Sequence, residues 1–225
     1  MFHVKQDLLR FRLVSKSLGI KIGSGELEKF ATYQKELSRW NKKINLISRS
    51  SDSPHHIFKH ILDSILILKA VTIPLGAKIL DFGSGAGFPG IPMKILRDDI
   101  SLTLLESRKK KAFFLEHMIK TLKFKGIEVI CKRAEDLVDS TNLRGKHYLV
   151  TAKAVGKLDN VTHSILPFLK VGGFLVAYKG KSSEDEIEGL SQREDFQFQN
   201  EIDFKLPEYD LTRNLIILKR IQPEL

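Results

Sequence analysis

Cysteine is nearly absent from this chain of 225 residues, and long apolar runs are missing altogether. A single cysteine, Cys131, excludes an internal disulfide and favours a reducing compartment, so we expect a cytoplasmic protein. The longest apolar run, near residues 65–70, is far too short to span a bilayer, and we expect no membrane partner. The first residues also lack the apolar stretch of a cleavable signal.

Acidic residues are scarce relative to basic ones. The chain has 27 Asp and Glu against 37 Lys and Arg, which gives a formal net charge of +10. Such an excess favours a polyanionic partner through counterion release, although charge alone does not separate RNA from DNA or an anionic membrane. Hydrophobic residues make up 42% of the chain, so we expect a globular protein with one sizeable core and a small appendage.

Apolar residues recur at helical spacing through the first third of the chain. The pattern predicts helices over residues 4–18, from an N-cap at Ser24 to about residue 44, and over residues 55–71. Pro74 and Gly76 end the third helix. We therefore expect an N-terminal helical cap over residues 1–75, followed by a core over residues 76–225.

Short apolar runs alternate with helical patterns in the rest of the chain. Strands are predicted near residues 79–80, 101–105, 127–131, 147–154 and 174–178, with helices between them. Two last strands, near residues 196–204 and 214–220, are expected to form an antiparallel pair. The alternation predicts an α/β, Rossmann-like fold with a seven-stranded, mostly parallel sheet and helices on both faces.

Residues 78–92 are the stretch around which this core is organised. A short apolar run ends at Asp81, and Gly83, Gly85, Gly87 and Gly90 follow before an apolar helical pattern begins. This order predicts a strand, a tight turn and a helix, the opening of a βαβ unit. Glycines allow positive φ and let a ligand approach the backbone, so Gly83 and Gly85 are candidate cofactor-binding residues.

Two nucleotide-like ligands fit such a turn. Residues 85–90 match the G-x-G-x-x-G pattern of a dinucleotide site, which keeps an NAD-dependent oxidoreductase as an alternative. Asp81 argues against it, because a carboxylate before the glycines would repel a pyrophosphate but suits the cationic amino-acid end of S-adenosylmethionine. Glu106, at the end of the next strand, is placed to bind ribose hydroxyls. The pattern favours a class I S-adenosylmethionine-dependent methyltransferase fold over a ligand-free glycine turn.

The ends of the later strands supply further candidates. Ala134 and Glu135 follow the third strand and are expected to line the adenine of the donor. An alternative is that Glu135 and Asp136 cap a following helix. Lys153 lies at the end of the fourth strand, nearest the transferred methyl group, unless it is simply a solvated lysine.

The same region shows which chemistry is missing. The end of the fourth strand lacks the Asn/Asp-Pro-Pro-aromatic clamp that is typical of exocyclic amine methylation. Methylation at pyrimidine C5 needs a cysteine nucleophile, whereas Cys131 is expected to be buried and inert inside the third strand. A target that is already nucleophilic, such as guanine N7, needs only alignment, so no catalytic residue is assigned. His56 and His60 lack a well-placed third ligand, and no metal site is expected.

Basic residues cluster directly after Glu106. Arg108, Lys109 and Lys110 open a helix, where cations oppose the helix dipole. Their position therefore indicates contact with RNA phosphates, and Lys179 is a weaker candidate for the same role. For Trp40 we expect a core anchor of the helical cap, with a base-stacking platform as the alternative.

Several of these segments together resemble a known family, the glucose-inhibited division protein B family, which is ribosomal small-subunit RNA methyltransferase G. The matching segments are residues 40–46, 60–64, 81–92, 105–107, 133–135 and 178–180. The resemblance implies transfer of a methyl group from S-adenosylmethionine to guanine N7 in bacterial 16S rRNA of the small ribosomal subunit. It also implies that Gly83, Phe88, Ala134 and Glu135 contact the donor. The family usually has arginine where Lys153 stands, and lysine keeps the charge but loses the bidentate fork.

Three hypotheses follow from the sequence. The leading one is a cytoplasmic 16S rRNA guanine-N7 methyltransferase. The alternatives are the NAD-dependent oxidoreductase and a non-catalytic RNA-binding assembly factor that keeps the fold without turnover.

Overall fold

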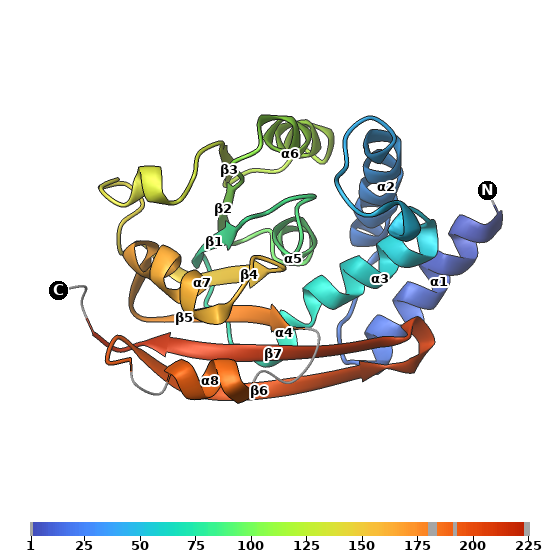
Figure 1. Ribbon diagram of the computed structural model, residues 1–225. Coiled ribbons are helices and arrows are strands. Elements are labelled where there is room, and N and C mark those ends of the chain that lie inside the picture. The colour runs from blue at the N-terminus through green and yellow to red at the C-terminus, as the bar shows by residue number, and fades with distance from the viewer. Residues whose placement is uncertain (1, 180–183, 191–192, 223–225) are drawn as a thin grey trace.

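A single sheet organises the protein in a computed structural model that describes residues 2–179, 184–190 and 193–222 (Figure 1). In these residues seven strands are arranged in the order β3-β2-β1-β4-β5-β7-β6. Strand β7 runs antiparallel to both β5 and β6, and the other neighbouring strands pair in parallel. The predicted α/β fold with a mostly parallel sheet is confirmed. The strands are β1 Lys78–Phe82, β2 Ser101–Leu105, β3 Ile127–Ile130, β4 His147–Lys153, β5 Leu169–Lys179, β6 Phe196–Leu206 and β7 Leu211–Arg220.

Helices precede and connect these strands. They are α1 Phe2–Ser17, α2 Ser24–Asn41, α3 Pro54–Ile65, α4 Ile67–Ala70, α5 Gly90–Leu96, α6 Lys109–Thr121, α7 Leu158–Ile165 and α8 Glu184–Leu190. Short 3-10 helices cover Arg49–Ser51, Glu135–Leu137, Leu166–Phe168 and Pro207–Tyr209. Among the described residues, none of the helices has the length and apolar content that crossing a membrane requires.

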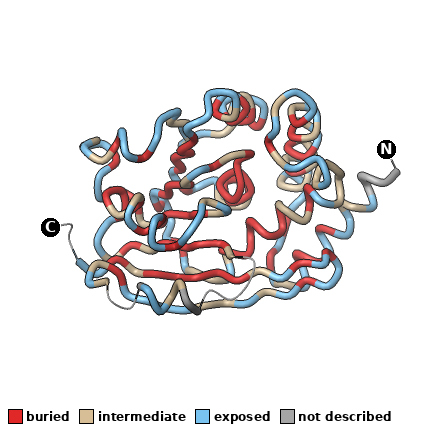
Figure 2. The backbone as a smooth tube through the Cα atoms, viewed as in Figure 1, coloured by how far each residue is buried: buried red, intermediate tan, exposed pale blue. Residues whose placement is uncertain are grey.

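Each face of the sheet has its own hydrophobic core. Neighbouring residues of a strand point to opposite faces, so Ile79 joins one cluster of buried side chains and Leu80 the other. The first cluster includes residues of α1, α2, α3, α5 and α6, and the second includes residues of α7. Figure 2 shows the buried strands between these two layers. Because helices cover both faces of the sheet, the loops that follow β1 to β5 come together at the carboxyl ends of these strands.

The N-terminal helices pack against the sheet layer through a continuous apolar face. Phe11 of α1 contacts the rings of Phe30 in α2 and Phe58 in α3, with centroid distances of 5.1 and 5.4 Å. The same buried cluster continues to Ile91 and Met93 in α5. Because one core includes both parts, the division into residues 1–75 and 76–225 as separate units stays a prediction.

Two local expectations were wrong. Ser24 is the first residue of α2 rather than its cap, because Gly23 has the extended backbone of an N-cap and its carbonyl accepts the first helical hydrogen bond, from Leu27. Cys131 is exposed and lies just beyond β3, which ends at Ile130. Strand β3 is at the edge of the sheet, so its last residues are not covered on both sides.

Close packing around Gly90 predicts a measurable loss of stability on substitution. A Cβ atom there would lie 2.6 Å from Cδ2 of Leu104 and 2.8 Å from Oδ2 of Asp81. We expect Gly90→Ala to lower the free energy of unfolding by about 1–3 kcal/mol, because the core must shift to accept the methyl group. Chemical denaturation measures this difference.

Gly25 in α2 provides the matched control, since nothing lies within 4 Å of a Cβ atom there. Gly25→Ala should be neutral or should stabilise by up to about 1 kcal/mol. If the two variants unfold with the same free energy, the packing around Gly90 is not tight.

Candidate active site

Asp81 lies behind the glycine loop that joins β1 to α5, and it has no exposed surface. Its Oδ1 accepts a hydrogen bond from the Thr151 hydroxyl at 2.8 Å, and its Oδ2 accepts one from the Gly90 N–H at 3.2 Å. Burial raises the pKa of Asp81 to about 6, while these hydrogen bonds favour the ionised form. The carboxylate thus connects β1, β4 and the start of α5.

Glu106 supports the same loop from the end of β2. Its side chain is 6% exposed, and its two oxygens accept hydrogen bonds from the Gly85 N–H at 2.9 Å and the Arg108 N–H at 2.8 Å. An ionised carboxylate has lone pairs left after accepting two bonds, so it can also accept from ribose hydroxyls. The ribose role stays a prediction, and the structure gives Glu106 a structural role, because it fixes the loop to the start of α6.

A pocket of about 330 Å³ opens beside this loop. Gly83, Ala134 and Glu135 line it together with apolar side chains of Phe82 and Leu105. Gly83 has a φ of 71°, and a Cβ atom there would lie 2.6 Å from Cγ1 of Val155, so glycine suits this position for both conformation and space. The pocket therefore brings together three of the predicted donor-binding residues. Ser107, Lys132 and Arg133 complete the lining, so the pocket has an apolar floor and a rim of mixed charge, to which Glu135 contributes a carboxylate.

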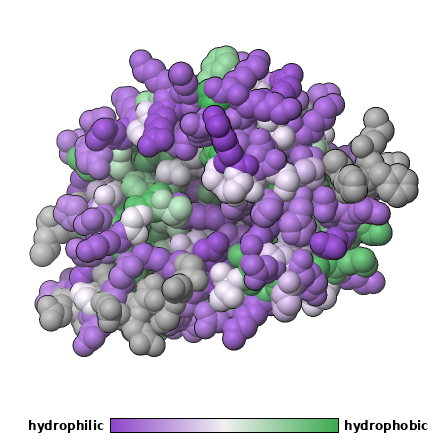
Figure 3. Space-filling view, turned by 45° about the vertical axis from the view of Figure 1, so that its right-hand side comes forward, coloured by the Kyte–Doolittle hydropathy of each residue, from purple (hydrophilic) through white to green (hydrophobic). Residues whose placement is uncertain are grey.

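A second pocket, of about 370 Å³, lies at the ends of β4 and β5. His60, Lys153, Tyr178, Lys179 and Arg213 contribute to its lining. The side chain that packs against Gly83 in the first pocket, that of Val155, also lines the second. The two pockets are therefore adjacent, because Gly83 of the first packs against Val155 of the second. On the face shown in Figure 3, hydrophobic residues gather in a recess bordered by hydrophilic ones.

A buried ion cluster fixes the position of Lys153. Its Nζ lies 2.8 Å from Oδ2 of Asp63, and Arg213 donates from Nε and Nη2 to the two oxygens of Asp63 at 2.7 and 2.9 Å. Burial alone would raise the pKa of Asp63, but Lys153 and Arg213 outweigh it and hold that pKa below its usual value. Lys153 also lies 5.2 Å from the ring centroid of Phe88. With 11% of its side chain exposed, it is not a solvated strand-end lysine.

Sequence reasoning missed Asp63 and Arg213 as parts of this site. Asp63 lies on the buried face of α3, among residues whose apolar pattern predicted the helix, and an acid at such a position is a usable signal. Arg213 is at the start of β7, more than a hundred residues away in sequence, and no local pattern joins it to α3.

Phe88 and Lys179 lie near the second pocket with partners of their own. Phe88 is 8% exposed, and its ring lies 5.5 Å from those of Tyr33 and His60. Lys179 donates to Oε2 of Glu186 at 2.7 Å and to the carbonyl oxygen of Gly156 at 3.1 Å. A lysine held in this way shapes the pocket rim, and its predicted phosphate contact would require exchange of a partner.

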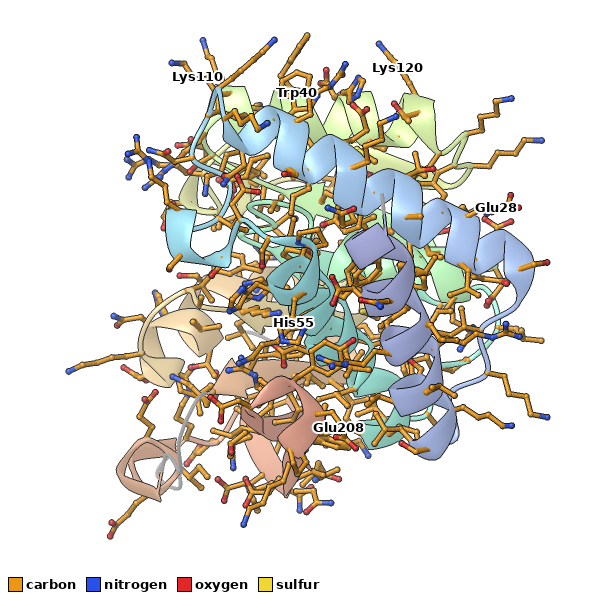
Figure 4. The ribbon with its side chains drawn as sticks, turned by 90° about the vertical axis from the view of Figure 1, so that its right-hand side faces the viewer. Glu28, Trp40, His55, Lys110, Lys120 and Glu208 are labelled. Atoms are coloured by element: carbon orange, nitrogen blue, oxygen red, sulfur yellow. The ribbon has the colours of Figure 1, made fainter. Side chains whose placement is uncertain are left out.

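The basic residues at the start of α6 form a different surface. Arg108, Lys109 and Lys110 are exposed and line a shallow depression of about 380 Å³ with Lys43 and Asn45. In the described part of the chain these three cations have no ion-pair partner, and Figure 4 shows Lys110 pointing outward. These cations thus lie at the start of the helix that Glu106 joins to the glycine loop, and their charges are available to an external anion.

Trp40 differs from the expected core anchor of the helical cap. It is half-buried and packs against α6 of the sheet layer, with its ring centroid 5.8 Å from those of Phe113 and Phe114 and 5.1 Å from that of His117. Because Trp40 is in the last turn of α2, it anchors that end of the helix on α6. The described residues contain no cluster of His, Cys, Asp and Glu that could hold a metal ion.

Comparison with known families identifies the chain. A sequence model described as rRNA small subunit methyltransferase G matches residues 26–216. The chain belongs to this family. Members include the ribosomal RNA small subunit methyltransferase G of Caldanaerobacter subterraneus subsp. tengcongensis, 38% identical over 92% of this chain and 87% of that protein. The same protein of Clostridium botulinum (strain Loch Maree / Type A3) is also 38% identical, over 86% and 82%.

Solved structures with similar folds are methyltransferases with little sequence identity. TYW2 of M. jannaschii, solved in complex with AdoMet, has a TM-score of 0.57 and 14% identity over 80% of each chain. Precorrin-6y C5,15-methyltransferase of Geobacter metallireducens has a TM-score of 0.54 and 14% identity, over 71% of this chain and 87% of that one. These similarities support the Rossmann-like methyltransferase fold of the family.

The environment of His60 predicts a specific pH dependence of stability. Burial, and next the charge of Lys153, lower the pKa of His60 from 6.5 to about 4. Its contribution to stability is therefore complete above pH 6.5 and is lost as the pH falls towards 4, because the unfolded chain binds a proton that the folded protein does not. When the pH is lowered from 7 to 4, we expect the free energy of unfolding to fall by about 3 kcal/mol more in the unsubstituted protein than in the His60→Gln variant.

Denaturation with urea at a series of pH values measures this difference. His163→Gln, at an exposed position in α7, is the control and should follow the unsubstituted protein. Parallel curves for the protein and His60→Gln would show that His60 is not held neutral.

Proposed function

We propose that this protein transfers the methyl group of S-adenosylmethionine to N7 of a guanine in 16S rRNA of the small ribosomal subunit. Family membership supports the reaction and the class of RNA. The observation that carries the proposal is the pair of adjacent pockets, one lined by Gly83 and the other by Lys153, that meet where Gly83 packs against Val155. A methyl transfer requires such a pair, since donor and acceptor must meet at one point from two sides.

The first pocket suits the donor. Gly83 and Gly85 present backbone without side chains, Glu106 offers acceptors to the ribose, and Ala134 and Glu135 form the wall for the adenine ring and its amine. When bound, S-adenosylmethionine supplies an electrophilic methyl carbon.

The second pocket suits the target base. Lys153 lines this pocket while Asp63 fixes its position, so its ammonium group is available to donate a hydrogen bond to O6 of a guanine. Because O6 is adjacent to N7 on the purine edge, that contact fixes the orientation of N7 relative to the donor pocket beside Gly83. The N7 lone pair attacks without losing a proton, which is why no general base is required.

The alternative hypotheses have less support. The G-x-G-x-x-G match at residues 85–90 remains the basis for an NAD-dependent oxidoreductase, but the family assignment favours methyl transfer. A non-catalytic assembly factor would have no need for an unobstructed donor pocket. We place the activity in the bacterial cytoplasm, where small-subunit RNA is made.

Methyl transfer to RNA tests the proposal directly. With labelled S-adenosylmethionine and small-subunit RNA from cells that lack this gene, we expect incorporation of label at one guanine, mapped as N7-methylguanine by borohydride and aniline cleavage. Naked RNA and intact small subunits should be compared as substrates. Absence of transfer to both, or label at another base atom, contradicts the proposal.

Donor binding provides a second measurement. We expect Glu106→Gln to weaken S-adenosylmethionine binding about tenfold or more, because a charged acceptor is lost, as calorimetry would show. Glu116→Gln, at an exposed position on α6, should bind as the unsubstituted protein does. Binding of NADH in place of S-adenosylmethionine would favour the oxidoreductase.

A further inference from the structure

Phe113 is an apolar ring that the fold leaves in solvent. Its side chain is 62% exposed although Phe114, the next residue of α6, is fully buried. The helical repeat places residues 109, 113, 116 and 120 on one stripe of α6, so Phe113 lies between Lys109 and Lys120 with the acid Glu116 beside it. An exposed aromatic ring flanked by lysines is the composition of a surface that stacks nucleic-acid bases.

A second ring extends this surface. Trp40 lies 5.8 Å from Phe113 and is itself half-buried, so the two rings meet across the α2–α6 contact. Glu36 of α2 also joins the two helices, because it accepts a hydrogen bond from Nε2 of His117 in α6 at 2.7 Å. The aromatic pair is therefore supported by a fixed helix contact. We call Trp40 and Phe113 the aromatic pair.

Positive charge surrounds the aromatic pair. Lys109, Lys110 and Lys43 line the adjoining depression, and Figure 4 shows Lys110 and Lys120 pointing outward on either side of Trp40. Lys111 lies on the other side of α6 from Phe113, and its Nζ comes within 3.9 Å of the point that a Cβ atom on Gly85 would occupy, so the aromatic pair lies on a helix that borders the glycine loop. Phe113 is four residues from Lys109, or about 6 Å along the helix.

We propose that the aromatic pair stacks an unpaired base of the substrate RNA, while the lysines around it bind the flanking phosphates. This inference rests on the proposed function and specifies that the enzyme binds unpaired bases of its RNA substrate. Unpaired bases are favoured over a duplex because the bases of a duplex are already stacked on each other. The cationic surroundings favour RNA over an apolar protein segment as the occupant.

The tryptophan provides a direct probe, because Trp40 is the only tryptophan in the chain. On addition of a single-stranded oligoribonucleotide, we expect quenching of its fluorescence that a double-stranded RNA of equal length does not produce. In Phe113→Ala the same oligonucleotide should bind about tenfold more weakly. Phe113→Tyr, which keeps the ring, should bind as the unsubstituted protein does.

Salt dependence separates stacking from charge. Phe113→Ala should leave the slope of log affinity against log salt unchanged, whereas Lys109→Gln with Lys110→Gln should reduce it by about one to two. Phe198→Ala removes an exposed ring from β6, at the opposite edge of the sheet, and is the matched control. Equal losses in Phe113→Ala and Phe198→Ala, or a Trp40 signal that ignores RNA, overturn the proposal.

The outcome is independent of the proposed methyl transfer. If the protein methylates small-subunit RNA and Phe113→Ala leaves the KM for naked RNA unchanged, the aromatic pair fails while the function stands. If Phe113→Ala impairs binding to intact small subunits only, the ring contacts a ribosomal protein and the base-stacking proposal is wrong. A loss with naked RNA and an unchanged affinity for S-adenosylmethionine is the expected result.

Discussion

One buried carboxylate determines how the active site is assembled. Asp81 has no exposed surface, yet its hydrogen bonds reach Thr151 in the neighbouring strand and the first N–H of α5. A buried carboxylate is costly unless such donors surround it, and donors here come from both sides of the loop. The shape of the glycine loop is thus tied to the register between β1 and β4. Glu106 repeats this arrangement at the end of β2, with one oxygen on the loop and the other on the start of α6.

A second buried carboxylate, that of Asp63, connects the N-terminal helices and the C-terminal strands to the active site. Asp63 is in α3, Lys153 ends β4 and Arg213 is near the start of β7, so three distant segments meet in one ion cluster. Removal of any one member would leave a buried charge without its partner, which is unfavourable. Such clusters therefore fix the positions of their side chains even where they add little to the free energy of unfolding. The N-terminal helices and the C-terminal hairpin therefore contribute to the position of Lys153, although neither supplies the donor pocket.

Local patterns in the sequence were sufficient for the sheet and the donor loop. Short apolar runs in the sequence show where the strands end, and the glycines from Gly83 to Gly90 predict a turn from local sequence alone. The residues at the strand ends could therefore be proposed before the structure was known. Contacts between distant segments could not be predicted in this way. The pairing of Asp63 with Arg213 depends on where β7 is inserted in the sheet, and the exposure of Cys131 depends on β3 being an edge strand. The packing of Trp40 on α6 depends likewise on how two helices cross.

The cations of this protein fall into two groups with different physical roles. Lys153, Lys179 and Arg213 have carboxylate partners close to the second pocket, so their charges are largely neutralised and their value is directional. Arg108, Lys109 and Lys110 have no such partner among the described residues and face solvent, so they retain their attraction for phosphate. Because the second group retains its attraction for phosphate, it is suited to salt-dependent binding of a polyanion, whereas the first group is held by its carboxylates and is suited to a directional hydrogen bond.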